Sequence, residues 1–467
     1  MRCNVLAAIV LAAGKGTRMK SQLPKVLHPV AGQPMVSCVL QAARRAGVQQ
    51  AVVVYGHGGE LVPQSLQATF SDLSFARQEE LNGTAKAVEA ALPALSADCR
   101  EVLVLCGDTP LLDGQTLQDF IDVHRCSAHQ VSILSAVIDE PASYGRILRD
   151  PEGQVTGIVE AKDATAQQLA IKEVNSGIYL VQRDFLQWAL PRIGCDNAQG
   201  EYYLPDIVGL AVEHDKGVGA VACADYTTTM GVNSRQELAV ASQVLFRRKC
   251  HELMAQGVTI IDPERTCIEY NVQVGTDTTI YPNVYLERGT EVGHNCLIRQ
   301  GCTLIASRLG DNCILKDGSY LEEASVGNSV SVGPYAHLRP GSQLDEHVKI
   351  GNFVEIKKST IGAHSKVSHL TYIGDAQVGR DVNIGCGTIT CNYDGFNKYR
   401  TVLEDGVFVG SDTQLVAPVR VGQGAMVGAG TTVTEDVPAD SLVLSRVRQK
   451  VIGGWAARFR HQQNEKS

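Results

Sequence analysis

The chain has 467 residues, of which 44% are hydrophobic, and it carries a formal net charge of -8. This length predicts two or three domains with ample cores, and the acidic balance argues against a general nucleic-acid or membrane-surface binder, which would present a basic face. Its 14 cysteines are scattered without C-x-x-C spacing and no apolar run reaches membrane-spanning length, so we expect a cytoplasmic protein with reduced thiols.

The first predicted strand ends in a glycine-rich, basic loop. Residues 7–19 read AAIVLAAGKGTRM, and another lysine follows at Lys25. A buried strand that ends in such a loop offers backbone N–H groups and cations to a phosphorylated ligand. The spacing matches neither a Walker A motif nor G-x-G-x-x-G, because Met19 stands where the third glycine would be. Taken alone, the loop is equally a tight turn between two elements.

Short apolar runs then alternate with helix-like stretches over the first half of the chain. The runs cover residues 51–55, 101–106, 131–137 and 177–181. This alternation predicts a mostly parallel sheet that is covered on both faces and binds ligands at the carboxyl ends of its strands. Asp108, next to Gly107 at such a strand end, can hold a hard cation such as Mg²⁺, and a helix cap or turn residue is the alternative.

Seven short motifs together resemble the sugar-1-phosphate nucleotidyltransferases. They are LAAGKGTRM (11–19), LPK (23–25), LCGDTPL (105–111), YGRI (144–147), IVE (158–160), VNSG (174–177) and GEYY (200–203). The resemblance covers about the first 235 residues. It implies that a sugar-phosphate oxygen attacks the α-phosphorus of a nucleoside triphosphate in line and that diphosphate leaves. Such a transfer needs charge neutralisation and alignment more than covalent help.

The same resemblance implies roles for individual residues. Lys15, Arg18 and Lys25 would face the phosphates, with Arg18 and Lys25 as the catalytic cations. Asp108 and Asn233 would carry Mg²⁺. The nucleotide would be held by Leu11, Ala12, Ala13, Gly14, Gln78, Gly83, Thr84, Cys106 and Gly107. The amino sugar would be held by Gly145, Glu160 and Asn175. The sequence departs from the family pattern at Leu81, Asn82, Lys86 and Cys106.

A charged, helix-forming segment separates this half from the next. Residues 234–256 read as a linker helix, and the last helix of the first domain is the alternative. We therefore expect a nucleotidyltransferase domain at 1–233, a linker helix at 234–256 and a second domain with a C-terminal tail at 257–467.

From Ile268 onward, an aliphatic residue returns every six positions. The register slips by one residue before Leu309, Val326, Ile361 and Val378, and Thr390 is the one inward position that is not Ile, Leu or Val. This period is typical of a left-handed parallel β-helix, a three-sided prism whose coils bury their aliphatic residues against neighbouring coils. Because the runs between slips contain whole numbers of three-sided coils, each slip should shorten one corner of a coil and leave the prism intact. The chain as a whole is thus predicted to be α/β, with a Rossmann-like first domain.

Two features of the repeat suggest chemistry. Residues 391–408 interrupt it and should form an excursion that carries binding groups or contacts a neighbouring subunit. His369 lies two residues past an inward position and should face outward, although a lone histidine is more often structural.

Four motifs in this half look like the acetyltransferase half of the bacterial bifunctional N-acetylglucosamine-1-phosphate uridyltransferases. They are NFVEIKK (352–358), HLTYIGD (369–375), NIGCGTITCNYDG (383–395) and VGSD (409–412). The resemblance implies that the amine of glucosamine-1-phosphate attacks the thioester of acetyl-CoA after His369 removes a proton. The sugar phosphate would be bound by Arg339, Lys357, Tyr372 and Asn383. Acetyl-CoA would be bound by Cys386, Asn392, Tyr393, Ser411, Ala429 and Arg446. A homotrimer with sites at the subunit boundaries is also implied.

The predicted function is therefore a two-step synthesis. Glucosamine-1-phosphate is acetylated with acetyl-CoA, and UMP is then transferred from UTP to give UDP-N-acetylglucosamine for cell-envelope precursors, with Mg²⁺ as cofactor and neither nucleic acid nor membrane as partner. One alternative keeps the nucleotidyltransferase and makes the β-helix an oligomerisation or regulatory module. Another is a zinc site in which His337, His364 and His369 approach histidines of other subunits.

Overall fold

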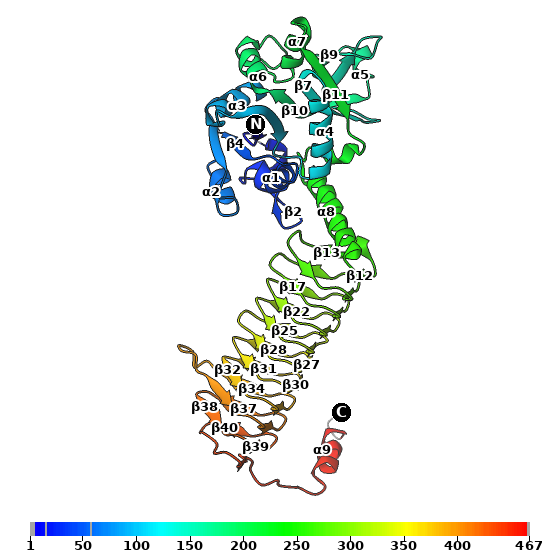
Figure 1. The fold of residues 1–467 in the computed structure, drawn as a ribbon. Helices are drawn as coiled ribbons and strands as arrows, with labels where there is room; N and C mark the ends of the chain where they lie inside the picture. Colours follow the sequence, from blue (N-terminus) through cyan, green and yellow to red (C-terminus); the bar gives the residue numbers. More distant parts are fainter. Residues whose placement is uncertain (1–4, 15, 57, 465–467) are drawn as a thin grey trace. The chain divides into compact units, whose positions relative to one another are not determined.

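The structure, a computed structural model of the chain, describes residues 5–14, 16–56 and 58–464. It divides into two compact units, Met1–Phe246 and Arg247–Ser467 (Figure 1). Helix α8 (Arg235–Ala255) contains the border between them and lies on the segment where the sequence predicts a linker helix. Among the described residues, every helix is too short or too polar to cross a membrane.

A nine-stranded sheet forms the centre of the N-terminal unit, and its main path runs β11-β7-β10-β6-β1-β4-β5. These strands are β1 (Val5–Leu11), β4 (Gln50–Gly56), β5 (Ser74–Gln78), β6 (Cys99–Cys106), β7 (His129–Val137), β10 (Glu173–Gln182) and β11 (Gly217–Ala222). A hairpin of β8 (Arg146–Arg149) and β9 (Val155–Val159) branches from β10. Neighbouring strands of the path are parallel except at β10, which is antiparallel to β6 and β7. The predicted mostly parallel sheet is confirmed, and β10 is an exception that an apolar run cannot reveal, because apolar content carries no strand direction.

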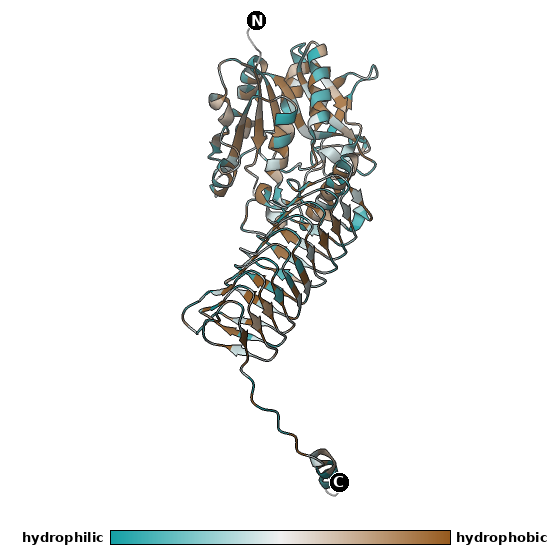
Figure 2. Ribbon diagram, turned by 60° about the horizontal axis from the view of Figure 1, so that its bottom comes forward, coloured by the Kyte–Doolittle hydropathy of each residue, from teal (hydrophilic) through white to brown (hydrophobic). Residues whose placement is uncertain are grey.

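Helices cover both faces of this sheet. Alternate residues of β1 enter two separate cores, with Ala7 and Ile9 in one and Leu6, Ala8 and Val10 in the other. One face is covered by α1 (Met35–Arg45), α2 (Leu61–Gln67) and α4 (Gly114–Cys126). The other face is covered by α3 (Thr84–Ala91), α6 (Arg183–Ala189) and α7 (Asp206–Glu213). Both faces of the central strands β1 and β4 are buried, and their sequences are accordingly runs of hydrophobic residues. Brown, hydrophobic strands are visible in the N-terminal unit in Figure 2.

The C-terminal unit is a three-sided prism of short parallel strands. Its first sheet runs from β12 (Thr259–Ile260) to β41 (Leu442–Val443), its second from β13 (Cys267–Ile268) to β40 (Thr432–Val433), and its third from β14 (Gln273–Val274) to β38 (Val419–Val421). Up to β38, each strand that has a following partner pairs with the strand three places further along the chain, so one coil contributes to all three sheets; at the end of the prism, β39 pairs with β41. The predicted β-helix is confirmed. After it, the chain ends in α9 (Trp455–Asn464).

The six-residue period marks the interior of the prism. The predicted inward positions are buried, except that Val274 is only partly so and still packs against the same core. Thr390 also points inward and is 1% exposed. Its hydroxyl accepts the Gly374 N–H at 2.7 Å and donates to the Gly374 carbonyl at 3.1 Å, so its polar group is satisfied by the neighbouring coil.

The four register slips lie at one corner of the prism, where the chain enters the third sheet. The slipped positions begin there in β20 (Arg308–Leu309), β23 (Ser325–Val326), β29 (Thr360–Ile361) and β32 (Ala376–Val378). Each shortened corner contains a non-glycine residue with a positive φ of 44 to 48°. These residues are Ala306, Glu323, Lys358 and Asp375. The prism stays continuous through all four slips, as predicted.

The predicted end of the interruption is wrong. The chain leaves the prism after β34 (Ile389–Cys391) and returns at β35 (Thr401–Leu403), which pairs with β32 and β38. The excursion is therefore residues 392–400 rather than 391–408. Leu403 is 1% exposed and stands six residues before Val409, so the period itself marked this position.

Candidate functional site

Two adjoining cavities open at the carboxyl edge of the N-terminal sheet. The larger has a volume of about 400 Å³ and the smaller about 320 Å³, and both are lined by Leu11, Thr84, Cys106 and Glu201. Strands β1 and β6 end at this edge, and β10 begins there because it runs antiparallel to β6. The edge is the place where the sequence predicts ligand binding.

Most residues predicted to bind the nucleotide line the larger cavity. They are Leu11, Ala13, Gly14, Lys25, Gln78, Gly83, Thr84, Cys106 and Asp108. Ala12 is buried beside them, and Gly107 lets two strand ends approach, because a Cβ there would lie 3.0 Å from the Leu11 carbonyl oxygen. Arg18 is exposed in the 3-10 helix η1 (Thr17–Met19) and lines neither cavity, so the structure does not bring it to the other residues. Lys15 lies outside the described residues.

The residues predicted to bind the sugar, Gly145, Glu160 and Asn175, line the smaller cavity. Asn175 is fixed by its own strand, since its Oδ1 accepts the Gly177 N–H and the Tyr179 hydroxyl, each at 3.0 Å. Burial, with the nearby carboxylates of Asp163 and Asp206, raises the pKa of Glu160.

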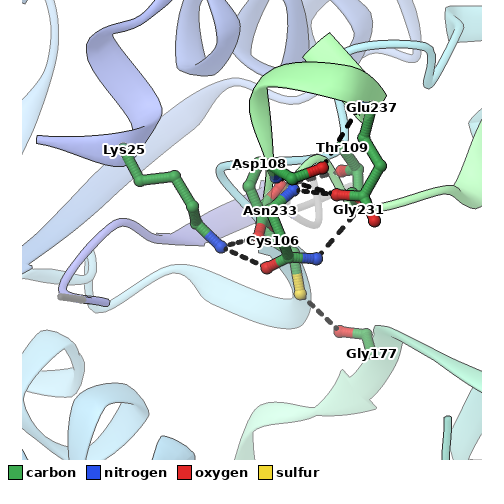
Figure 3. A network of polar contacts seen from close by, with 9 residues as sticks. Lys25, Cys106, Asp108, Thr109, Gly177, Gly231, Asn233 and Glu237 are labelled. Atoms are coloured by element: carbon green, nitrogen blue, oxygen red, sulfur yellow. Dashed lines mark hydrogen bonds and ion pairs between the residues drawn. The ribbon is translucent and has the colours of Figure 1, made fainter. Parts of the chain in front are cut away.

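A lysine joins the two residues that are predicted to carry the metal (Figure 3). The Lys25 ammonium forms an ion pair with Asp108 Oδ2 and donates to Asn233 Oδ1 at 2.9 Å. The side chains of Lys25 and Asp108 are only 13% and 19% exposed. A carboxylate and an amide oxygen are hard ligands of the kind that Mg²⁺ takes, and here they already surround a cation. The donor set therefore fits a magnesium ion.

The start of α8 holds Asn233 in place. The backbone N–H groups of Asn233 and Ser234 donate to Glu237 Oε2 at 2.6 and 2.9 Å, and the Glu237 N–H donates to Ser234 Oγ at 3.2 Å. The Val232 N–H donates to the Asp108 carbonyl at 2.8 Å, which ties the two loops together. Glu237 was not among the predicted residues, although the spacing S-x-x-E at 234–237 is the signature of this helix-capping arrangement.

Tyr144 and Arg146 are further residues that the sequence analysis left without a role. Tyr144 lines the smaller cavity, and its hydroxyl lies near the Gly231 backbone in the loop that leads to Asn233. Arg146 is 2% exposed and donates to the carbonyls of Ala142, Tyr144 and Leu169. Both belong to the motif YGRI, so the signal was present. What the sequence does not show is that Arg146 turns inward to hold the loop.

Cys106 stands between the two cavities. Burial raises the pKa of its thiol to about 12, with the Asp108 carboxylate adding to the effect, and its Sγ donates to the Gly177 carbonyl at 3.6 Å. A neutral thiol here is a small apolar wall rather than a reactive group.

On the prism, His369 is exposed at the end of β30 (Lys366–His369), as predicted. Its Nδ1 lies 2.6 Å from Oδ1 of Asn352, which is its partner in the preceding coil, on β27 (Lys349–Asn352). Because an amide oxygen only accepts, this contact places the ring proton on Nδ1 and leaves Nε2 free to accept a proton. Asn352 belongs to the motif NFVEIKK, but its contact with His369 was not predicted from the sequence.

Several residues predicted to bind acetyl-CoA follow His369 down the same corner of the prism. Cys386, Ser411 and Ala429 stand two residues past an inward position in successive coils, as His369 does. Backbone hydrogen bonds join these coils, from the Asp412 N–H to the Cys386 carbonyl at 2.7 Å and from the Gly430 N–H to the Ser411 carbonyl at 2.8 Å. Arg446 reaches the same column, since its Nη2 would lie 3.0 Å from a Cβ at Gly428.

The remaining predicted residues lie on other parts of the prism. Arg339 and Lys357 stand at the corner between the second and third sheets, as does Asn392, which donates to Asp375 at 2.6 Å. Tyr372 points from the second sheet, on β31 (Tyr372–Gly374), whereas Asn383 belongs to the first, on β33 (Asn383–Ile384). Tyr393 is 59% exposed in the excursion. One chain thus spreads the predicted sugar-phosphate residues over two faces.

A cluster of cations occupies the corner that holds Arg339 and Lys357. The ammonium of Lys398, from the excursion, lies against Lys357 and, together with the Arg339 guanidinium, lowers the pKa of Lys357. Arg339 Nη1 also donates to Glu355 Oε1 at 2.8 Å. Like charges that crowd in this way favour a bound anion such as a phosphate. Lys398 was noted in the sequence only as part of the excursion.

Within one chain, the described residues form no group of three or more His, Cys, Asp or Glu side chains that could hold a metal ion. His364 stacks face to face on His347, with ring centroids 4.9 Å apart. A zinc site that needs histidines of several subunits remains a hypothesis about the assembly.

Comparisons with known proteins agree with this division of the chain. The MobA-like NTP transferase domain family matches residues 8–171, the bacterial transferase hexapeptide family matches residues 323–358, and the hexapeptide repeat of succinyl-transferase matches residues 400–435. The chain is 51% identical to the bifunctional protein GlmU of Pelobacter propionicus, over 97% of this chain and 99% of that protein. It is 52% identical to the GlmU protein of Trichlorobacter lovleyi and 50% identical to that of Geobacter metallireducens, in each case over 98% of this chain and 99% of the relative. The chain therefore belongs to the bifunctional GlmU family and is a uridylyltransferase and an acetyltransferase in one polypeptide.

Proposed function

We propose that the two activities are separate steps of one synthesis, carried out at two sites. The prism acetylates glucosamine-1-phosphate, and the N-terminal unit then transfers UMP from UTP to N-acetylglucosamine-1-phosphate. The observation that carries the proposal is the centre formed by Lys25, Asp108 and Asn233, at the edge of a larger and a smaller cavity that share one wall.

In the uridylyl transfer, UTP occupies the larger cavity and the sugar the smaller. Asp108 and Asn233 would hold Mg²⁺, which supplies neutralisation of the phosphate charge. Lys25 and Lys15 align the phosphates, and Gly145, Glu160 and Asn175 hold the sugar. Arg18 lines neither cavity and has no part in this proposal. The shared wall at Cys106 and Thr84 keeps the sugar phosphate next to the α-phosphorus, so that in-line attack needs little further motion.

In the acetyl transfer, His369 removes a proton from the ammonium of glucosamine-1-phosphate, because an ammonium has no lone pair for attack on the thioester. Asn352 holds the imidazole with Nε2 unprotonated. Arg339, Lys357 and Lys398 bind the phosphate, with Tyr372 and Asn383 against the sugar. Acetyl-CoA lies along the column of Cys386, Ser411 and Ala429, with Asn392, Tyr393 and Arg446.

The proposed assembly is a homotrimer. Tyr372 and Asn383 point from different faces of one prism, and a neighbouring prism would bring such residues to one substrate.

The proposed location is the cytoplasm, since every cysteine that the structure describes is unpaired.

The proposal is tested on the full chain by following CoA and diphosphate separately. With glucosamine-1-phosphate, acetyl-CoA, UTP and Mg²⁺, CoA release should precede diphosphate release. With N-acetylglucosamine-1-phosphate, diphosphate should form without acetyl-CoA. Diphosphate release from glucosamine-1-phosphate at full rate without acetyl-CoA would contradict the proposed order.

A further inference from the structure

We infer that the Lys25 ammonium is a resident counter-cation of the metal site, which Mg²⁺ must displace and thereby release toward the substrate phosphates. The inference rests on the proposed function, because it concerns the oxygens of Asp108 and Asn233 that would hold the metal. It adds a competition that couples metal binding to phosphate binding.

The geometry forces the competition. The ammonium contacts both proposed ligand oxygens, through the ion pair with Asp108 Oδ2 and the 2.9 Å hydrogen bond to Asn233 Oδ1. Magnesium needs its oxygen ligands at about 2.0–2.1 Å. An ion at that distance from both oxygens would lie in the space between them that the ammonium now fills (Figure 3). Two like charges cannot occupy that place together.

The lysine, rather than the ligands, is free to move. The Asp108 carbonyl is bonded to the Val232 N–H, and the backbone of Asn233 is held by Glu237, so the backbone positions that carry the two short side chains are tied together. Lys25 instead reaches the site on a flexible four-carbon stem from the short 3-10 helix η2 (Lys25–Leu27).

The displaced ammonium has a defined neighbourhood. The stem of Lys25 passes the glycine-rich loop so closely that a Cβ at Gly16 would lie 2.6 Å from Lys25 Cβ. An ammonium that leaves Asp108 therefore remains beside the loop that is proposed to meet the triphosphate. Bound phosphates attract the Lys25 ammonium away from the oxygens that would hold Mg²⁺. Bound Mg²⁺ in turn releases the same ammonium to the phosphates. Metal and triphosphate then strengthen each other's binding by the same factor.

The first test measures binding of Mn²⁺ alone, by electron paramagnetic resonance, in the absence of nucleotide. Removal of a charge-assisted hydrogen bond that competes with the metal should raise the affinity of Lys25→Met for Mn²⁺ by about tenfold over wild type. Lys25→Arg keeps the competing charge and should stay near wild type. Lys20→Met is the matched control, because Lys20 is an exposed lysine that lies just before Lys25 in the sequence, and its affinity should change less than about twofold.

An affinity of Lys25→Met that is equal to or lower than wild type would overturn the inference. The same holds if Lys20→Met raises the affinity as much, because the effect would then be general electrostatics. Neither result touches the proposed function, which would fail instead if wild-type protein released no diphosphate from UTP and N-acetylglucosamine-1-phosphate.

The second test uses the wild-type protein. Its lysines are acetylated briefly with an N-hydroxysuccinimide ester, with and without Mg²⁺, and the extent of acetylation at each lysine is measured by mass spectrometry. Released from its ion pair, Lys25 should be labelled several-fold faster when Mg²⁺ is present, while labelling of Lys20 stays constant. Unchanged or slower labelling of Lys25 would contradict displacement.

Discussion

At the scale of single residues, the N-terminal site depends on contacts between distant parts of the chain. Lys25 and Asn233 are 208 residues apart and share one hydrogen bond. That these residues act together was implied by the resemblance to the nucleotidyltransferases, since Asn233 lies outside the seven motifs. Two residues that hold others in place were not predicted: Glu237 binds the backbone of Asn233, and Asn352 binds the ring of His369. Each acts through another residue, and the partner cannot be read from the sequence.

Asn352 provides the first prediction. Its replacement in Asn352→Ala removes the hydrogen bond that orients the His369 ring, so the kcat of acetyl transfer should fall about tenfold. The measurement is CoA release at saturating substrates. Uridylyl transfer by the same protein is the internal control for folding and should not change. Acetyl transfer at the wild-type rate would show that the ring needs no such support.

The cations around Lys357 provide a prediction about pH. A protonated lysine binds a phosphate dianion and a neutral lysine does not, so the KM for glucosamine-1-phosphate should rise as the pH increases through the lowered pKa of Lys357. In Lys398→Met, the pKa of Lys357 returns upward because its nearest like charge is gone. The rise in KM should then move to higher pH, even though KM near neutrality is larger.

The measurement is KM in acetyl transfer between about pH 7 and 10 for both proteins. The amine of the substrate titrates in both experiments, so the difference between the two profiles reports the protein. Superimposable pH profiles would contradict the assigned cause of the shift.

At the scale of elements, the prism was predicted more fully than the sheet. Its period depends on local alternation within each coil, and the slips could be read from the same pattern. The direction of β10 depends instead on pairing between distant segments, which periodicity does not encode. The return of the chain at β35 was marked by Leu403, six residues before Val409, and was overlooked. The helix-capping motif at 234–237 was also overlooked, although it is local and can be recognised in the sequence.

At Thr390, the repeat pattern and the structure lead to opposite predictions for stability. By pattern alone, Thr390→Val would restore an aliphatic residue and stabilise the prism. In the structure it deprives the Gly374 N–H of its partner, so we predict a loss of about 1–3 kcal/mol in the free energy of unfolding. Calorimetric unfolding of the full chain measures the change. Thr432→Val, at an exposed position of β40, should stay within about 0.5 kcal/mol of wild type.

At the scale of the whole molecule, the proposed trimer predicts that subunits complement each other. If residues of one acetyl-transfer site come from two subunits, trimers that mix His369→Ala with Asn383→Ala chains contain some sites in which both residues are intact. Co-expressed chains should then recover a measurable fraction of the wild-type CoA release, although each variant alone is inactive or weak. No recovery in trimers proved to be mixed by mass spectrometry would place both residues in one subunit.

The central claim is that one chain carries two chemically independent sites. Asp108→Ala should abolish uridylyl transfer and leave acetyl transfer near its wild-type rate, while His369→Ala should do the reverse. The direct measurement is diphosphate and CoA release by the two purified variants side by side, with the natural substrates of each step. Each variant should lose one product and keep the other, and loss of both products in either variant would contradict the two-site account.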